Sequence, residues 1–206
     1  MKKFHRFFQA LGMMLIACIV TAPASGAEVA GIKFDDTIRI ANQDLKLNGA
    51  GIRHKLIFKV YAAGLYLQEG KNTVPDVLAA PGVKRVSITM LREVSSEEFG
   101  RGFMQGLQQN TDKADKAKLV TQLQKLGELF AAIPELKKGD VLTTDWIPGT
   151  GTILQLNGKR LLDPLPDVAF YHALLKIWLG DKPVDQKLKL AMLGGDSADE
   201  KRGTNN

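Results

Sequence analysis

The chain has 206 residues, of which 45% are hydrophobic, 24% charged and 7% aromatic, with 20 Gly, 8 Pro and a single Cys. This composition excludes a disordered, collagen-like or disulfide-stapled protein, and the length suits one globular domain with a buried core. A function must therefore be sought in a site on that domain.

Residues 1–27 have the pattern of an export signal. Three basic residues precede an apolar run over residues 10–20, and the small residues Ser25-Gly26-Ala27 follow as a cleavage point. The apolar run is too short to span a bilayer comfortably. Removal of this segment would take three Lys/Arg and no acid with it, so the formal net charge would fall from +6 to +3. We expect an exported, periplasmic protein with no transmembrane span after processing.

The single cysteine, Cys18, lies inside this segment. Cleavage after Ala27 would leave a domain with no disulfide and no thiol nucleophile, which suits an oxidising compartment. A second interpretation is a lipoprotein, because residues 15–18 have the form of a lipoprotein box that would make Cys18 the lipidated first residue. Ile19 and Val20 argue against it, since a polar tether is expected after the lipidated cysteine.

Residues 28–194 contain no repeat, low-complexity tract or long linker, so we expect one domain there, followed by a polar, disordered tail over residues 195–206. The first part of the domain is rich in β-branched and aromatic residues, which predicts strands. The predicted strands are Val29–Phe34 and Thr37–Ile40 around a hairpin turn at Asp35-Asp36, a long stretch over Ile52–Leu67, and Val83–Leu91. Alternation along the last strand predicts that one face of the sheet is covered.

Helices are predicted to cover this sheet. One is capped by Ser96 and repeats an apolar residue every four positions, and a second spans residues 119–133 before Pro134 ends it. Strands return at 141–147, 152–156 and 159–162, the last two joined by Asn157-Gly158 as a tight hairpin. Asp167 caps a last helix that Gly180 closes. This order indicates an α+β fold with a mostly antiparallel sheet.

Several kinds of site have no support in the sequence. Only two histidines follow residue 27, and there is no HExxH, CxxC or cluster with metal-ligand spacing, so neither a metal nor another cofactor is predicted. The glycine-containing loop at 148–152 lacks the Lys-Ser/Thr and the helix of a phosphate cradle, and we predict a turn between strands. The low charge of the processed chain, with no basic cluster interleaved with aromatics, argues against nucleic-acid binding.

The segment Leu47–Lys55 carries the functional information, because it places a Gly-x-Gly ahead of Arg53 inside a strand-like run. Arg53 has apolar neighbours, so its guanidinium must either reach water or meet an anion such as a carboxylate or phenolate. Tyr61 follows at an even separation and would face the same cavity if the strand kinks or folds back. The structural alternative is that Arg53 extends to water and Tyr61 is a core residue.

Three stretches stand out by their order: Gly-x-Gly-Ile-Arg followed by Lys-Val-Tyr-Ala-Ala-Gly-Leu-Tyr-Leu, then Ser-Ser-Glu-Glu-Phe, then Lys-Ile-Trp-Leu-Gly-Asp-Lys-Pro-Val-Asp. Together they resemble the bacterial chalcone isomerase-like family, over residues 30–194. The resemblance implies an open-faced β-sandwich, in which helices cover one face of a large antiparallel sheet and an apolar ligand cleft lies between them.

By this resemblance Arg53 matches the family's functional arginine. In the plant enzymes that arginine holds the phenolate that adds to an enone, and in related fatty-acid-binding members an arginine and a tyrosine hold a carboxylate. The strand threonine of the enzymes falls on Tyr61, and their tyrosine and asparagine fall on Phe99 and Gly106. The stretch between Arg53 and Tyr61 is also shorter than in the enzymes.

These departures from the enzyme pattern remove polar groups. Phe99 and Gly106 share a helical face and lack the hydroxyl and amide that polarise the substrate. Ile177, beside Trp178, falls on a Ser/Thr of the enzymes and removes another hydroxyl. Losing such donors costs about 3 kcal/mol each in transition-state stabilisation.

Three functions are consistent with these residues. The first is an exported binding protein without classical isomerase activity, whose cleft takes an apolar ligand with an anionic head, such as a fatty acid. Arg53 would pair with the head and Tyr61 would hydrogen-bond it. The second is an intramolecular lyase or isomerase in which Arg53 and Tyr61 are catalytic, and the third is a cell-envelope interaction module whose cleft is packed shut. The predicted ligand contacts are Arg53, Tyr61, Phe99, Phe103, Gly106, Ile177 and Trp178.

Overall fold

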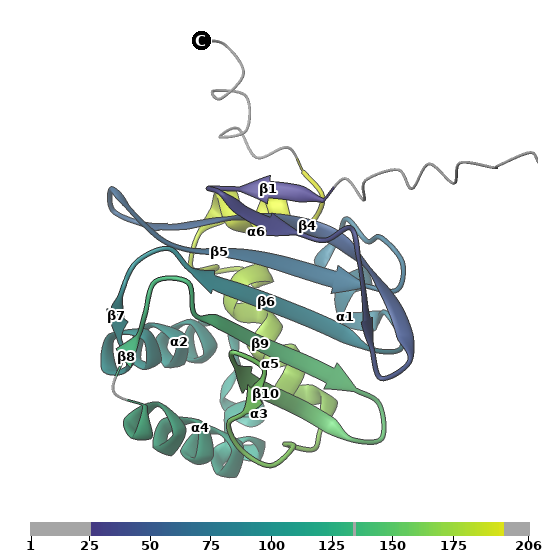
Figure 1. The fold of residues 1–206 in the computed structure, drawn as a ribbon. Coiled ribbons are helices and arrows are strands. Elements are labelled where there is room, and N and C mark those ends of the chain that lie inside the picture. The colour runs from purple at the N-terminus through teal and green to yellow at the C-terminus, as the bar shows by residue number, and fades with distance from the viewer. Residues whose placement is uncertain (1–25, 134, 196–206) are drawn as a thin grey trace, which may run out of the picture.

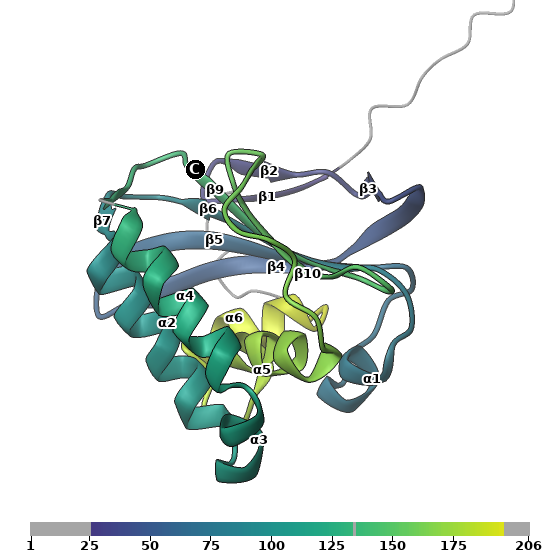
Figure 2. The same ribbon diagram turned by 90° about the horizontal axis from the view of Figure 1, so that it is seen from below.

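The structure is a computed structural model that describes residues 26–133 and 135–195. In this part of the chain seven strands form one antiparallel sheet in the order β11-β10-β9-β6-β5-β4-β3, and helices pack against one face of it (Figures 1 and 2). The strands of this sheet are β3 (Thr37–Ile40), β4 (Gln43–Lys55), β5 (Phe58–Leu67), β6 (Lys84–Met90), β9 (Val141–Ile147), β10 (Gly151–Leu156) and β11 (Lys159–Arg160). The predicted α+β fold, with a mostly antiparallel sheet and helices on one face, is confirmed.

The remaining elements are short strands and the helices. The short strands are β1 (Ala27–Val29), β2 (Ile32–Phe34), β7 (Val94–Ser95) and β8 (Glu135–Leu136). The helices are α1 (Val74–Ala79), α2 (Ser96–Asn110), α3 (Lys113–Lys118), α4 (Val120–Ala132), α5 (Val168–Leu179) and α6 (Gln186–Met192). Among the helices so described, none is both long and apolar enough to cross a membrane.

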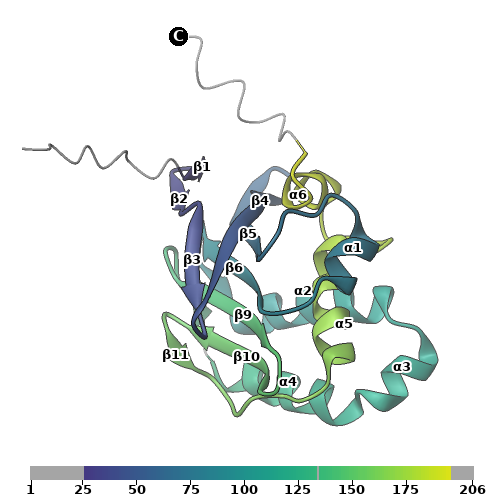
Figure 3. The same cartoon turned by 90° about the vertical axis from the view of Figure 1, so that its right-hand side faces the viewer.

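The sheet separates two apolar clusters. The larger lies between the sheet and the helices, because β5, β6, β9 and β10 direct apolar side chains to that face and the helices direct theirs back. The smaller lies on the opposite face, where the β1–β2 hairpin and β3 fold over Leu45 and Tyr66 (Figure 3). The hairpin therefore shields part of the face that the helices leave open.

The long stretch Ile52–Leu67 is not one strand, because the chain reverses at Leu56-Ile57 and β5 pairs antiparallel with β4. This reversal puts Arg53 directly opposite Tyr61 in the ladder. A register shift follows between Arg53 and His54, so one extra residue of β5 is accommodated there as a bulge.

Two glycines of the Gly-x-Gly motif let α6 lie directly on β4. A Cβ at Gly49 would come within 2.0 Å of the Ala191 carbonyl oxygen, and one at Gly51 within 2.7 Å of the Ala191 Cβ. Asn48 stabilises the contact between α6 and β4, because its side-chain amide donates to the Met192 carbonyl at 2.7 Å. The sequence did not lead us to predict α6, although its docking site explains why glycines precede Arg53.

The hairpin turn predicted at Asp35-Asp36 is wrong. The β1–β2 turn falls instead at Ala30-Gly31, with φ of 53° and 79°, and β3 pairs with β4 through Ala41-Asn42, with φ of 48° and 61°. Tight hairpin turns favour positive φ at both central residues, which Gly and Asn adopt readily. These two pairs therefore take the turns, and Asp35-Asp36 only links β2 to β3.

Several other local predictions are confirmed. Asn157 and Gly158 both have positive φ and join β10 to β11, and the loop at 148–152 is a turn between β9 and β10. Asp167 caps α5, with its carboxylate accepting from the Ala169 N–H at 2.8 Å. The cap of α2 is Ser95 rather than the predicted Ser96, because it is the Ser95 hydroxyl that accepts the Glu98 N–H.

A buried ion pair joins two central strands. Arg85 and Asp145 face each other across β6 and β9, and the guanidinium makes two hydrogen bonds of 2.6 Å to the carboxylate. The Asp145 side chain is 3% exposed. A bidentate geometry of this kind compensates the desolvation of both charges, whereas either charge alone would be costly to bury.

We predict that Asp145→Ala lowers the free energy of unfolding by about 3 kcal/mol, because it leaves the Arg85 charge without its partner. The matched control is Asp44→Ala, which breaks the exposed Arg39–Asp44 pair and is expected to cost less than about 1 kcal/mol. Urea unfolding of both variants checks this. Equal losses of unfolding free energy would show that the Arg85–Asp145 pair contributes no more to stability than an exposed ion pair.

Candidate functional site

Arg53 lies near the end of β4, with its side chain only partly exposed to solvent. Its guanidinium carbon lies 5.5 Å from the centre of the Tyr61 ring, so the cation is over the aromatic face. The Nε atom is buried and has no hydrogen-bond partner in the described residues. No carboxylate of those residues lies within ion-pair distance of the guanidinium. Arg53 is thus a permanent charge at the edge of an apolar core, without a direct ion-pair partner among those residues.

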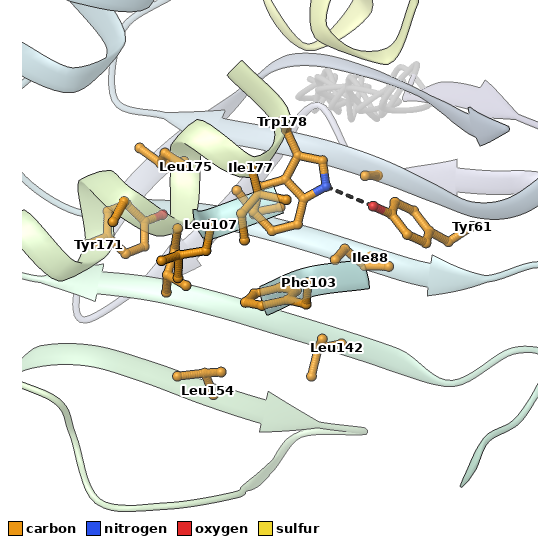
Figure 4. Packing of buried hydrophobic residues seen from close by; sticks show 14 of the residues in the cluster. Tyr61, Ile88, Phe103, Leu107, Leu142, Leu154, Tyr171, Leu175, Ile177 and Trp178 are labelled. Atoms are coloured by element: carbon orange, nitrogen blue, oxygen red, sulfur yellow. Dashed lines mark hydrogen bonds between the residues drawn. The ribbon is translucent and has the colours of Figure 1, made fainter. Parts of the chain in front are cut away.

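Tyr61 is held from α5 by a hydrogen bond. The Trp178 indole N–H donates to the Tyr61 hydroxyl oxygen at 2.9 Å, and Figure 4 shows the two groups directed toward each other. Both side chains are buried, with exposures of 3% and 1%. Burial raises the pKa of the Tyr61 phenol, and the Arg53 charge offsets only part of that rise. The phenol therefore keeps its proton and can donate to an acceptor near Arg53.

A very small cavity lies at this point, between β4, β5, α2 and α5. Its volume is about 10 Å³, which is room for a single water molecule at most. The residues around it are Arg53, Tyr61, Phe99, Gly102, Phe103, Ile177 and Val184. The apolar cleft expected from the resemblance is therefore closed, because side chains fill it, and this is the arrangement expected for the alternative of an interaction module.

Aromatic rings do most of the filling. Phe99 packs against Tyr61 and Phe103 with ring centres 6.2 and 6.0 Å apart. Phe103 also meets Trp178 edge-on at 5.8 Å (Figure 4). Phe130 of α4 closes the cluster, 5.7 Å from Phe99 and 5.5 Å from Phe103. Tilted and edge-on contacts at these distances are favourable, so the closed state is well packed.

Two glycines set how α2 meets the site. A Cβ at Gly106 would lie 3.0 Å from Ile177 and 3.2 Å from Val184, so this position is filled by its neighbours. A Cβ at Gly102 would meet only the Arg53 Nη2, at 3.8 Å. The guanidinium therefore lies against α2 at a point where that helix carries no side chain, and a Cβ there would be in ordinary contact with it.

The structure brings the predicted site residues into one place. Arg53 and Tyr61 sit opposite each other on β4 and β5, Phe99, Phe103 and Gly106 come from α2, and Ile177 and Trp178 from α5. Sequence reasoning missed Gly102 and Val184. A signal for Gly102 exists, because α2 contains three glycines, which are unfavourable in a helix interior unless space demands them. Val184 lies between α5 and α6, outside any regular element, and no sequence pattern marks it.

A second hollow lies on the outer side of Phe130, between α2 and α4. Its volume is about 550 Å³. Apolar and small residues form much of its wall, among them Gly100, Met104, Ala131 and Ile133. Phe130 borders this hollow and also contacts the rings that fill the Arg53 cavity, so it is the partition between the two spaces.

Charged neighbours of the site are already engaged. The Asp185 carboxylate accepts the His54 backbone N–H at 2.8 Å, and Lys55 pairs with Glu98 at 2.9 Å. Within residues 26–133 and 135–195, no three His, Cys, Asp or Glu side chains are grouped to hold a metal ion. The chemistry available at the cavity is therefore that of one guanidinium and one phenol.

The sequence profile of the chalcone isomerase-like family matches residues 26–194. The chain therefore belongs to this family, as its motifs indicated. A search of curated proteins finds no matching sequence.

The fold resembles a solved structure, that of a fatty-acid binding protein of Arabidopsis thaliana. The two are 16% identical, the match covers 79% of this chain and 92% of the plant protein, and the TM-score is 0.61. At this identity the likeness establishes a shared fold.

We predict that Tyr61→Phe destabilises the protein by about 1–3 kcal/mol, because the buried Trp178 N–H loses its acceptor. Tyr171→Phe is the matched control: Tyr171 is equally buried, but its hydroxyl makes only a long bond of 3.4 Å to the Thr144 carbonyl. Urea unfolding compares the two. If they lose the same stability, the Tyr61–Trp178 bond contributes nothing beyond an ordinary phenol.

Proposed function

We propose that this chain binds an apolar molecule with an anionic head, such as a fatty acid, without catalysing its conversion. The observation that carries this proposal is the Arg53 guanidinium, which is partly buried, lacks an anionic partner in the described residues and has a buried Nε without an acceptor. A cation in this position is costly unless an anion compensates it. We propose that the ligand supplies the anion.

A carboxylate matches the donors at hand. The planar guanidinium presents parallel N–H groups that suit two carboxylate oxygens. Tyr61 adds a third donor, because its oxygen already accepts from Trp178 and its proton remains free. Gly102 has no side chain to cover the guanidinium from α2, so the head group can approach Arg53 on that side.

The tail requires the cavity to open, since about 10 Å³ does not accommodate a chain. The route we propose passes Phe99 and Phe103 and displaces Phe130, which joins the cavity to the hollow between α2 and α4. That hollow, of about 550 Å³, has the volume of an ordinary ligand site. The fatty-acid binding protein of the same fold supports this class of ligand.

Catalysis is the weaker alternative. Phe99, Gly106 and Ile177 place no hydroxyl or amide against the cavity, so a developing oxyanion would have only Arg53 and Tyr61 to stabilise it. We also propose that the protein acts after export, on the strength of its N-terminal signal pattern. Residues 1–25 of that pattern and residues 196–206 of the predicted tail lie outside the described residues, whereas Ala27, the last residue of the predicted signal, is the first residue of β1.

The first test compares the parent with Arg53→Met, which keeps the aliphatic length and removes the charge. Native mass spectrometry of protein purified from its own exported fraction is expected to show a bound acidic lipid in the parent alone. Added palmitate is expected to bind at least about tenfold more weakly to the variant, whereas methyl palmitate should not distinguish them. Equal palmitate affinity for both would overturn the role of Arg53.

A second variant tests the site without touching the arginine. Gly102→Leu places a side chain directly against the guanidinium, and we expect it to abolish palmitate binding. It should also raise the stability of α2 by up to about 1 kcal/mol, so lost binding cannot be ascribed to unfolding. Ala117→Leu is the control, because it adds a side chain of the same size at an exposed position of α3, away from the cavity and the hollow. Undiminished binding by Gly102→Leu would place the head group elsewhere.

A further inference from the structure

The turn between β4 and β5 exposes three consecutive large apolar side chains. Leu56 is 90% exposed, Ile57 86% and Phe58 51%. Figure 1 shows this turn at the left-hand end of the sheet, on the side where β7 leads into α2. Single exposed apolar residues are common on soluble proteins, but three together at a protruding tip are characteristic of an interaction site.

The turn does not need these residues in order to form. Leu56 has φ of 56°, in the left-handed region that Gly, Asn and Asp occupy far more readily than leucine. The two-residue turn, closed by the Lys55–Phe58 pair, would be better served by a sequence such as Asn-Ser. Leu56 is thus solvent-exposed and in a backbone conformation that is unfavourable for leucine, which points to a role for its side chain.

Basic residues surround the tip. Lys55 and Lys59 flank the apolar triplet in the chain, and the Arg92 guanidinium lies 5.0 Å from the centre of the Phe58 ring. Lys55 pairs with Glu98, whereas Lys59 and Arg92 have no ion-pair partner among the residues described. The tip is therefore apolar at its apex, and below it lie two cations that make no direct ion pair with the described residues.

We propose that the β4–β5 turn inserts Leu56, Ile57 and Phe58 into the surface of a bilayer that contains anionic lipid. Apolar side chains enter the boundary between head groups and acyl chains, while lysine and arginine remain at the level of the phosphates. A narrow, convex tip suits a bilayer better than another protein, because a stable protein interface needs a far broader complementary surface.

Docking in this way would bring the candidate site to the lipid. Arg53 precedes Leu56 by three strand residues, which is roughly 10 Å, and side chains of interfacial segments reach about that depth. An acidic lipid leaving the bilayer beside the turn would pass the surface cations Lys59 and Arg92 and then meet the Arg53 guanidinium. This link rests on the proposed function, whereas the docking itself rests on the turn alone.

The test is flotation of the purified protein with vesicles of phosphatidylcholine, with and without phosphatidylglycerol. The intact mass of every preparation is measured first, so that all proteins compared begin at the same residue. The variant Leu56→Asn/Ile57→Ser removes the apolar apex while relieving the strained turn. Lys59→Gln/Arg92→Gln removes the free charges, and Leu190→Ser removes an exposed leucine elsewhere as the control.

We expect the parent and Leu190→Ser to float with the phosphatidylglycerol vesicles, and Leu56→Asn/Ile57→Ser to bind at least about tenfold more weakly while melting no lower than the parent. Lys59→Gln/Arg92→Gln should lose about tenfold on anionic vesicles and little on neutral ones. Unchanged flotation of the apex variant would overturn the proposal. So would a parent that ignores vesicles but self-associates through the tip in sedimentation velocity.

Ligand binding at Arg53 and membrane docking of the β4–β5 turn can be tested independently of each other. Arg53→Met is expected to float like the parent, because it leaves the apex and its charges in place. Leu56→Asn/Ile57→Ser is expected to bind palmitate in solution like the parent. Loss of palmitate binding by the apex variant, with flotation intact, would contradict the division of roles between the turn and the cavity.

Discussion

A guanidinium that cannot lose its charge, held at the edge of an apolar core, is the constraint on which the candidate site depends. The β4–β5 reversal places Arg53 against the Tyr61 ring, and the glycines at 49 and 51 let α6 support β4 from the helical side. The aromatic face offsets part of the cost of the charge, but a π-system does not satisfy the buried Nε–H. The fold therefore holds a buried donor and a positive charge that a bound anion can compensate.

The closed cavity works against the binding of an anion to Arg53, because the cavity must open to admit a ligand. Phe99, Phe103 and Phe130 pack against Tyr61 and Trp178 at favourable distances, so opening the cavity sacrifices aromatic contacts and exposes apolar surface. A ligand with an apolar tail replaces that lost contact, whereas a small anion would not. The pairing of one charged group with an aromatic cluster that can open is the basis on which we propose an amphipathic ligand.

Much of the fold was predictable because its strongest signals are local. The Asn157-Gly158 hairpin and the Asp167 cap depend on residues adjacent in sequence, whereas the Asp35-Asp36 turn failed because the positive-φ pairs at 30–31 and 41–42 compete for the same segment. Arg53 and Tyr61 stood out as polar groups in an apolar run. Gly102, Val184 and the Arg85–Asp145 pair did not, because each acquires its meaning from a neighbour brought close only by the tertiary fold. That the cleft is closed likewise depends on how rings from four elements, β5, α2, α4 and α5, pack.

The Arg53 Nε–H group itself gives the most direct test of whether a ligand's head group compensates this charge. Its NMR resonance can be followed while palmitate is added to the protein, with methyl palmitate as the uncharged comparison. A carboxylate that accepts from this group is expected to shift the resonance and slow its exchange with water, saturably and in step with changes at the Phe99 and Phe103 rings. Saturating palmitate binding that leaves the Arg53 resonance unmoved would contradict the central claim that the ligand's head group compensates this charge.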